Sequence, residues 1–171
     1  MPDREPANRE KTCLVPGSFD PPTLGHRFLV EEAVRRYGRV LVVGFINSEK
    51  RYTFTESQRK RLMKEQFGDL PVVLGFSRGM LYAYCRRHGV DVILKGVRNM
   101  QDREYELKMA EYNAARCPSA VTVLIDAPPE LEEVSSSTAR ALLTDGGEAE
   151  RLLGPGVARL CLGYLEKNKN K

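Results

Sequence analysis

The fold of this chain is decided by the stretch Val15-Pro16-Gly17-Ser18-Phe19-Asp20-Pro21-Pro22-Thr23-Leu24-Gly25-His26. A short apolar segment comes before it, and apolar residues recur at helical spacing over residues 28–37. The glycines and prolines between these two segments are typical of a loop. The pattern therefore predicts a strand, a turn and the start of a helix. Such a helix start favours a bound phosphate, because its backbone N–H groups are unpaired and lie at the positive end of the peptide dipoles.

Several residues of this turn suit an anion. Gly17 has no Cβ, so a bulky anion can approach the backbone there, and Ser18 adds a hydroxyl and an amide. Phe19 completes the turn, and His26 would aim its imidazole into the same pocket from the start of the helix. The other interpretation of His26, a helix cap whose ring is satisfied by the backbone, stays open. His88, which precedes Gly89 at a predicted helix end, is expected only to complement the helix dipole.

The rest of the chain alternates between apolar strands and amphipathic helices. This alternation predicts a doubly wound α/β domain, in which a five-stranded parallel sheet has helices on both faces and ligands bind at the carboxyl ends of the strands. Gly17, Lys50 and Lys95 each follow a predicted strand, so their loops should meet at one crevice. After the first strand we expect strands at residues 39–46, 71–75, 91–94 and 120–125, and helices that begin after the capping box Thr55-Glu56-Ser57-Gln58, near 80–88, at 101–116, after Ser135, and beyond Gly154 through Tyr164.

Length and composition favour a single domain. With 171 residues, 42% of them hydrophobic, the chain suits one core of the usual domain size. We expect residues 1–11 to be a disordered extension, residues 12–166 to be the domain, and residues 167–171 to be a frayed tail. A net charge of +4 is mild. It agrees with anionic ligands and does not indicate nucleic acid.

Several classes of protein are excluded by what the sequence lacks. Its four cysteines are too widely spaced for a zinc site, so we expect reduced, buried thiols. No apolar run reaches the ~18 residues of a membrane span, and residues 1–11 lack the apolar centre of a signal peptide, which favours the cytoplasm. Neither a G-x-x-x-x-G-K-[ST] loop nor a G-x-G-x-x-G fingerprint is present, which excludes the common ATPase and dehydrogenase sites.

The available donors suit a triphosphate and a second phosphorylated substrate. A phosphate monoester, with a second pKa near ~6, is already ionised at neutral pH, so it needs little general-base help to attack the α-phosphorus of ATP. Catalysis would then depend on in-line positioning and on neutralising charge that develops in the transition state. We assign His26 to the α-phosphate. The expected donors are the turn at residues 17–19, His26, Lys50, Lys95, Arg98 and the serines at 135–137.

Four segments resemble the motifs of the small adenylyltransferases. The T-x-G-H form at residues 23–26 is typical of the phosphopantetheine adenylyltransferase family, and the resemblance extends from Leu14 to about Leu143. Two features depart from the family pattern: Lys95 replaces the first arginine of R-G-x-R, and Leu131-Glu132-Glu133 lacks the expected aromatic residue. The other matching segments are Lys95-Gly96-Val97-Arg98, Asp102-Arg103-Glu104-Tyr105-Glu106 and Val134-Ser135-Ser136-Ser137.

The resemblance implies roles for individual residues. Open alternatives are a solvated Lys50 whose neighbour Arg51 replaces it, a Met80 that belongs to the core, and serines at 135–137 that only cap a helix. The implied catalytic residues are His26, Lys50 and Arg98; the implied ATP-binding residues are Gly17, Ser18, Phe19, His26, Gly96, Val97, Arg98, Glu106, Ser135, Ser136 and Ser137; the implied acceptor-binding residues are Ser18, Lys50, Met80 and Lys95.

The resemblance also implies a reaction and an assembly. A Rossmann-like member of this family would join ATP and 4′-phosphopantetheine into dephospho-coenzyme A and pyrophosphate, with Mg²⁺ bound through the ATP phosphates. It would be a cytoplasmic homohexamer with coenzyme A as a feedback ligand, and neither nucleic acid nor a membrane would be a partner. The alternatives are a related nucleotidyltransferase with nicotinate mononucleotide or a cytidine nucleotide, and a non-catalytic nucleotide-sensing or RNA-binding protein on the same fold.

Overall fold

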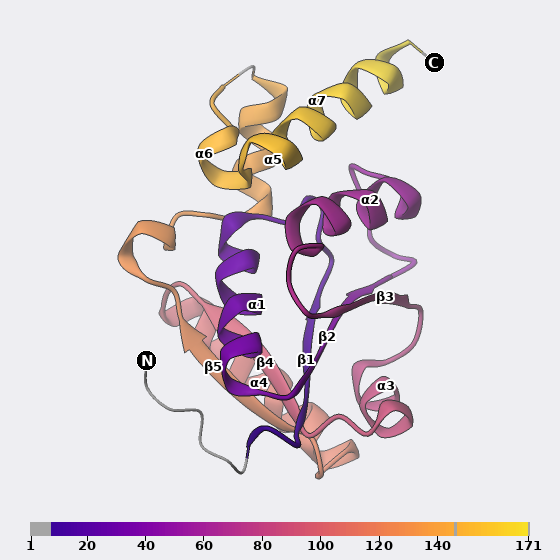
Figure 1. Ribbon diagram of the computed structural model, residues 1–171, viewed down its shortest axis with the longest axis vertical. Coiled ribbons are helices and arrows are strands. Elements are labelled where there is room, and N and C mark those ends of the chain that lie inside the picture. The colour runs from indigo at the N-terminus through magenta and orange to yellow at the C-terminus, as the bar shows by residue number, and fades with distance from the viewer. Residues whose placement is uncertain (1–7, 146, 171) are drawn as a thin grey trace.

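A five-stranded parallel sheet forms the centre of the computed structural model, which describes residues 8–145 and 147–170 (Figure 1). The strand order is β3-β2-β1-β4-β5, and every neighbouring pair is parallel. The predicted doubly wound α/β fold is therefore confirmed. The order reverses beside β1, where β4 adds to the side away from β2. The strands are β1 (Thr12–Gly17), β2 (Arg39–Phe45), β3 (Val73–Ser77), β4 (Val92–Val97) and β5 (Val121–Asp126).

Four of the five strands, β1, β3, β4 and β5, end one to three residues later than predicted. Gly17 ends β1, where it pairs with Gly44, and Lys95 lies inside β4, where it pairs with Leu124. The prediction that Gly17 and Lys95 follow their strands was therefore wrong by a few residues. The ladder with β5 continues through Val97 and satisfies the backbone there. The third strand begins at Val73, two residues after the predicted start.

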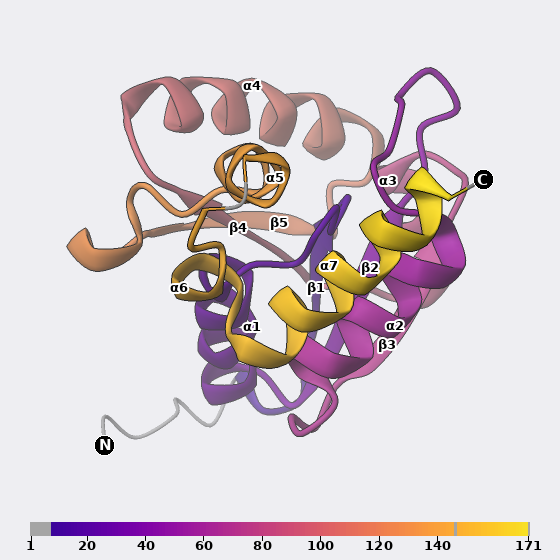
Figure 2. The ribbon, with the colours of Figure 1, turned by 90° about the horizontal axis from the view of Figure 1, so that it is seen from above.

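Helices cover both faces of the sheet. Seen from above, α1 and α2 lie on one face and α4 on the other (Figure 2). The predicted capping box is present at α2, where Thr55 and Gln58 bond each other's backbone N–H groups, and Gly89 ends α3 with a φ of 60°. The helices are α1 (Leu24–Arg36), α2 (Glu56–Phe67), α3 (Leu81–His88), α4 (Met100–Arg116), α5 (Ser136–Thr144), α6 (Glu150–Leu153) and α7 (Pro155–Lys169), with a 3₁₀ turn, η2, at Pro129–Leu131.

The central strand β1 is buried on both faces, as its uninterrupted apolar sequence predicts. Cys13 and Val15 pack with Val30 on the face covered by α1. Leu14 packs on the opposite face with Ile93 of β4. Because successive side chains of a strand point to opposite faces, this one strand joins two cores.

The C-terminal helices α5, α6 and α7 form a third cluster with α2, above the carboxyl ends of the strands (Figure 1). The sequence did not indicate α6, which is only four residues long. Helix α7 continues to Lys169, three residues into the segment expected to fray. The predicted disordered extension falls mostly on residues 1–7, outside the described residues, and residues 8–10 form a turn.

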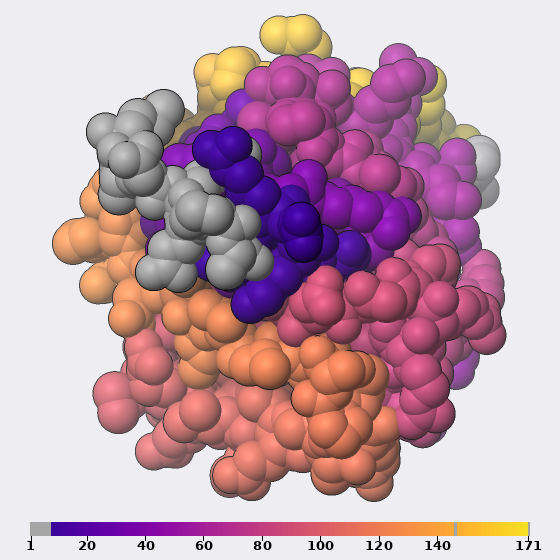
Figure 3. Space-filling view, turned by 60° about the horizontal axis from the view of Figure 1, so that its bottom comes forward, coloured from indigo at the N-terminus to yellow at the C-terminus, as the bar shows by residue number. Residues whose placement is uncertain are grey.

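Figure 3 shows the molecule from the side of the amino ends of the strands. Segments that are far apart in the sequence, coloured indigo, magenta and orange, lie next to one another on this surface.

The four cysteines are buried and unpaired, as predicted. Within residues 8–145 and 147–170, no helix is long and apolar enough to cross a membrane.

Candidate functional site

A pocket of about 340 Å³ opens at the carboxyl ends of β1 and β4. This is the point where the strand order reverses, and it is the usual place for a ligand in an open α/β sheet. Segments from both strands, α1, α4 and α5 contribute to its wall. Of the residues singled out from the sequence, it is lined by Gly17, His26, Lys95, Gly96, Val97, Arg98, Glu106, Ser135, Ser136 and Ser137.

His26 combines a structural role with a free donor. Thr23 is the N-cap of α1, and its hydroxyl accepts a hydrogen bond from the His26 backbone N–H at 3.3 Å. In return, the Thr23 backbone N–H donates to Nδ1 of the His26 ring at 2.9 Å. The ring thus closes a capping box in the place where glutamate or glutamine is usual. The predicted alternative, a capping histidine, is confirmed, and it leaves Nε2 for a ligand.

The charge state of His26 follows from its surroundings. Its pKa is lowered from 6.5 to about 4, chiefly by burial and also by the positive charges of Lys95 and Arg98. The ring is therefore neutral at physiological pH. Because Nδ1 accepts the Thr23 N–H, the single ring proton lies on Nε2. His26 presents a neutral N–H donor on the pocket wall.

Gly17 has a second role that the sequence did not indicate. A Cβ at this position would lie 3.1 Å from the ring of Phe19, so the glycine makes room for that ring. Phe19 itself is 1% exposed and packs edge-on against His26 and Phe67, with centroids 5.0 and 5.7 Å away. Phe19 stays a predicted ATP-binding residue through its backbone alone, because its side chain belongs to the core.

Long-range hydrogen bonds hold the turn between β1 and α1. The buried Asp20 carboxylate accepts the backbone N–H groups of Thr53 and Phe54 at 2.8 and 2.9 Å. From α5, Arg140 donates to the Asp20 carbonyl at 2.8 Å, and the Ser136 hydroxyl donates to the Pro21 carbonyl at 2.8 Å. Sequence reasoning missed these contacts. The excess of Pro and polar residues indicated a loop, but no local pattern reports partners more than thirty positions away.

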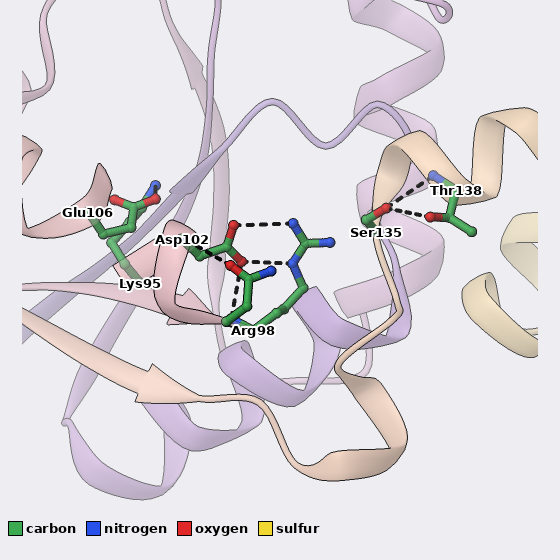
Figure 4. Close-up of polar contacts among 7 residues, drawn as sticks. Lys95, Arg98, Asp102, Glu106, Ser135 and Thr138 are labelled. Carbon is green, nitrogen blue, oxygen red and sulfur yellow. Dashed lines mark hydrogen bonds and ion pairs between the residues drawn. The ribbon is translucent and has the colours of Figure 1, made fainter. Parts of the chain in front are cut away.

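Two ion pairs lie side by side at the amino end of α4 (Figure 4). The Lys95 ammonium is 3.3 Å from the Glu106 carboxylate. Arg98 donates from Nε to Asp102 at 2.9 Å, and its backbone N–H donates to the same carboxylate at 3.1 Å. Burial alone would raise the pKa of Asp102, but these hydrogen bonds lower it overall. The two pairs place two basic and two acidic side chains around the pocket.

The serines at the start of α5 use their hydroxyls internally. Ser135 is the N-cap, and its hydroxyl accepts the Thr138 N–H at 3.0 Å (Figure 4). Ser137 accepts from Arg140 at 3.2 Å. As the first two residues of the helix, Ser136 and Ser137 have backbone N–H groups without an acceptor inside the helix. The amides of this helix start, more than the hydroxyls, are the donors for an anion.

Of the four predicted acceptor-binding residues, Lys95 lines the pocket, whereas Ser18, Lys50 and Met80 lie outside its lining. Lys50 is exposed in the loop of residues 46–54, with its ammonium 3.5 Å from the Ser18 hydroxyl, so it borders the anchored turn. Met80 is 50% exposed at the start of α3, and the alternative of a core methionine is wrong. The structure therefore brings Ser18 and Lys50 together next to the pocket and leaves Met80 apart from it.

Comparisons with known proteins agree with this architecture. The cytidylyltransferase-like family model matches residues 14–142. A phosphopantetheine adenylyltransferase of Thermotoga neapolitana is 34% identical over 92% of this chain and 98% of its own length, and one of Flavobacterium psychrophilum is 33% identical over 86% and 97%.

A solved structure supports the fold alone. The Plasmodium falciparum nicotinic acid mononucleotide adenylyltransferase complexed with NaAD has a TM-score of 0.62 to this chain, covers 94% of it and 96% of itself, and is 16% identical. The two phosphopantetheine adenylyltransferases have a higher sequence identity to this chain, 34% and 33%, and they align over 92% and 86% of it. This chain therefore belongs to the phosphopantetheine adenylyltransferase family, within the cytidylyltransferase-like proteins.

Proposed function

We propose that this chain is an enzyme that transfers AMP from ATP to 4′-phosphopantetheine, giving dephospho-coenzyme A and pyrophosphate. The carrying observation is that His26, Arg98 and the start of α5 line one pocket although they are far apart in the sequence. The relatives at 33–34% identity are named for this activity, which supports the choice of acceptor.

At the nucleotide end, each group has a role that its chemistry fits. The His26 Nε2–H would donate to an α-phosphate oxygen, a hydrogen bond that strengthens as charge develops in the transition state. Arg98 would offer a bidentate fork to the outer phosphates. The amides at the starts of α1 and α5 would hold phosphate oxygens without side chains. Gly17, Gly96, Val97 and Glu106 line the same wall and are proposed to contact the nucleotide.

At the acceptor end, Ser18, Lys50, Met80 and Lys95 are proposed to hold 4′-phosphopantetheine. Its ionised phosphate oxygen would form a bond to the α-phosphorus while the bond from that phosphorus to the bridging oxygen of pyrophosphate breaks. No proton has to be removed from the nucleophile, so the residues position the two substrates in line. Lys95 differs from the family arginine because an ammonium lacks the planar fork, and Glu106 already pairs with it.

Magnesium would arrive with the nucleotide. Among the described residues, no group of three or more His, Cys, Asp or Glu side chains could hold a metal ion. We propose that Mg²⁺ would be bound through ATP phosphates and water, where it would neutralise phosphate charge. We further propose a cytoplasmic enzyme with coenzyme A as a feedback ligand and with neither nucleic acid nor a membrane as a partner.

A homohexamer is also proposed. Tyr105, Met109 and Tyr112 share one face of α4 and are at least 37% exposed, and the apolar Met100 and Val121 are also exposed. Apolar surface of this kind on a soluble domain is commonly covered by another subunit. Light scattering after gel filtration tests this, since it measures the mass of the assembly. Tyr105→Glu should reduce this mass. A wild-type protein with the mass of a monomer would contradict the proposal.

The decisive experiment is an assay of pyrophosphate release with one acceptor at a time. Pyrophosphate should be released from ATP when 4′-phosphopantetheine is the acceptor. It should not be released when nicotinate mononucleotide replaces this acceptor, or when CTP replaces ATP. His26→Ala should suppress the activity. Release with nicotinate mononucleotide alone would assign the related nucleotidyltransferase reaction, and no release with any acceptor would favour the non-catalytic nucleotide-binding alternative.

A further inference from the structure

Arg59 is a buried cation that the site described so far does not use. It lies on α2, is 2% exposed, and forms no ion pair within residues 8–145 and 147–170. Its Nε atom is buried without a hydrogen-bond partner. Burying an unpaired charge costs free energy, and a guanidinium cannot release its proton to avoid that cost. A residue this costly in so buried a place calls for a reason other than stability.

The contacts of Arg59 point to that reason. Nη1 donates to the backbone carbonyl of Ser18 at 2.9 Å. The guanidinium carbon also lies 3.9 Å from the centre of the Tyr52 ring. Arg59 therefore contacts the anchored turn through Nη1 and the loop of residues 46–54 through the Tyr52 ring, with the centre of the Phe76 ring 5.3 Å from the same guanidinium carbon.

Tyr52 connects Arg59 to the loop that carries Lys50. Its hydroxyl accepts the Asn47 N–H at 2.8 Å, and the Lys50 N–H donates to the Asn47 carbonyl at 3.1 Å. The Lys50 ammonium in turn lies 3.5 Å from the Ser18 hydroxyl. Arg59 thus holds Ser18 from its carbonyl side and, through Tyr52, holds the loop that places Lys50 on its hydroxyl side.

We propose that Arg59 is a positioning residue that fixes Lys50 against Ser18, and so aligns the phosphate of the acceptor. The expected effect on the kinetics rests on the proposed function, because it assumes that 4′-phosphopantetheine is the acceptor. The planar fork is essential to it, since an ammonium cannot stack flat on Tyr52 while donating to Ser18. Arg59 does not need to touch either substrate, because a displacement of about 1 Å in a positioning group can cost up to about 100-fold in rate.

The kinetic test uses Arg59→Lys, with Arg61→Lys as the matched control because Arg61 is exposed on the same helix. Arg59→Lys should lower kcat/KM for 4′-phosphopantetheine about tenfold or more and change the KM for ATP less than twofold. Arg61→Lys should change neither. Equal losses for both substrates would overturn the proposal, because they would indicate a general structural role.

A double-mutant cycle separates a positioning role from an independent one. If Arg59 acts through Lys50, Arg59→Lys should cost less than about twofold in the Lys50→Ala background. Losses that multiply would overturn the proposal. Tyr52→Leu removes the stacking partner at a half-exposed position and should reproduce much of the loss, so it carries the test if Arg59→Lys does not fold.

A structural readout keeps this inference separate from the assignment of the acceptor. Lysines labelled with ¹³C-methyl groups give resonances, of which that of Lys50 is identified by its loss in Lys50→Arg. Arg59→Lys should shift the Lys50 resonance, and Arg61→Lys should leave it in place. A wild-type protein inactive on 4′-phosphopantetheine would overturn the proposed function alone, whereas an unshifted Lys50 resonance would overturn the role of Arg59.

Discussion

The anchored turn of residues 17–26 and the Lys50 loop of residues 46–54 border the same site and are built differently. The turn is held by buried and partly buried hydrogen bonds from the backbone of the Lys50 loop and from α5. The Lys50 side chain is exposed, and its ammonium lies 3.5 Å from the Ser18 hydroxyl. The turn therefore presents its donors from a largely buried framework, whereas Lys50 reaches the site as an exposed side chain that its loop places against Ser18.

This difference fits the chemistry that we propose. A donor that stabilises developing charge must be in place before the reaction, because reorganisation at that moment would add to the barrier. We therefore expect substitutions in the turn to have larger effects than substitutions around the Lys50 loop.

The largest effect is expected from the donor of the anchored turn. His26→Ala should lower kcat by about 10²–10³, the usual loss when one transition-state donor is removed. His26→Gln separates the two roles of the ring, because glutamine can close the capping box. Pyrophosphate release and thermal unfolding should show His26→Gln slow but nearly as stable as wild type. Full turnover in either variant would remove His26 from the mechanism.

The protonation of His26 gives a pH test of the same region. Its pKa is expected at about 4 rather than 6.5, which NMR titration of the imidazole nitrogens measures directly. Between these values the unfolded chain binds the proton and the folded chain does not, so the free energy of unfolding should fall as the pH drops from 6.5 towards 4. Above pH 6.5, His26 is neutral in both states, so it no longer makes the free energy of unfolding depend on pH. In His26→Gln this part of the acid sensitivity should disappear.

Next in size is the anchor of the turn. Asp20→Asn replaces a carboxylate that accepts two backbone N–H groups with an amide that offers only one acceptor oxygen. The loss should be about 1–3 kcal/mol in the free energy of unfolding, measured by urea titration. Asp69→Asn is the control, since its exposed pair with Arg27 should contribute less than about 1 kcal/mol. Equal losses of stability in Asp20→Asn and Asp69→Asn would contradict the role of Asp20 as the anchor of the turn.

A smaller effect is expected at Lys50. Lys50→Ala should raise the KM for 4′-phosphopantetheine about tenfold, consistent with the loss of one charged hydrogen bond, while stability stays unchanged. Arg51→Ala is the matched control in the same loop. A larger loss in Arg51→Ala than in Lys50→Ala would assign the role to the neighbour.

The smallest effect is expected at Met80. Because this side chain is 50% exposed and lies away from the pocket, Met80→Ala should change the free energy of unfolding by less than about 0.5 kcal/mol. The KM for 4′-phosphopantetheine should rise only a few-fold. An unchanged KM would remove Met80 from the acceptor site.

Local sequence patterns predicted the frame of the molecule. The strand, turn and helix start at residues 12–26, the capping box at Thr55 and the cap at Ser135 all depend on neighbours in the chain, and the structure confirms them. The carboxyl ends of β1 and β4 also border one pocket, as the topology of a parallel sheet leads one to expect. For these features, short-range chemistry is sufficient.

What could not be predicted depends on contacts between distant segments. The Asp20 carboxylate receives N–H groups from more than thirty positions away, and Arg140 reaches the Asp20 carbonyl from 120 positions away. Phe19 was expected at the ligand because it sits in the turn, whereas core packing decides its orientation. Arg59 gave no signal, since a basic residue on an amphipathic helix usually faces solvent.

The tautomer of His26 also limits what chemistry a ligand can bring to this wall. With one ring nitrogen committed to the amino end of α1, the other offers hydrogen and no lone pair. An inhibitor should therefore carry an electron-rich atom, such as a sulfonyl or carboxylate oxygen, toward that nitrogen. A compound with an amine or hydroxyl hydrogen pointed there would meet another hydrogen and bind poorly.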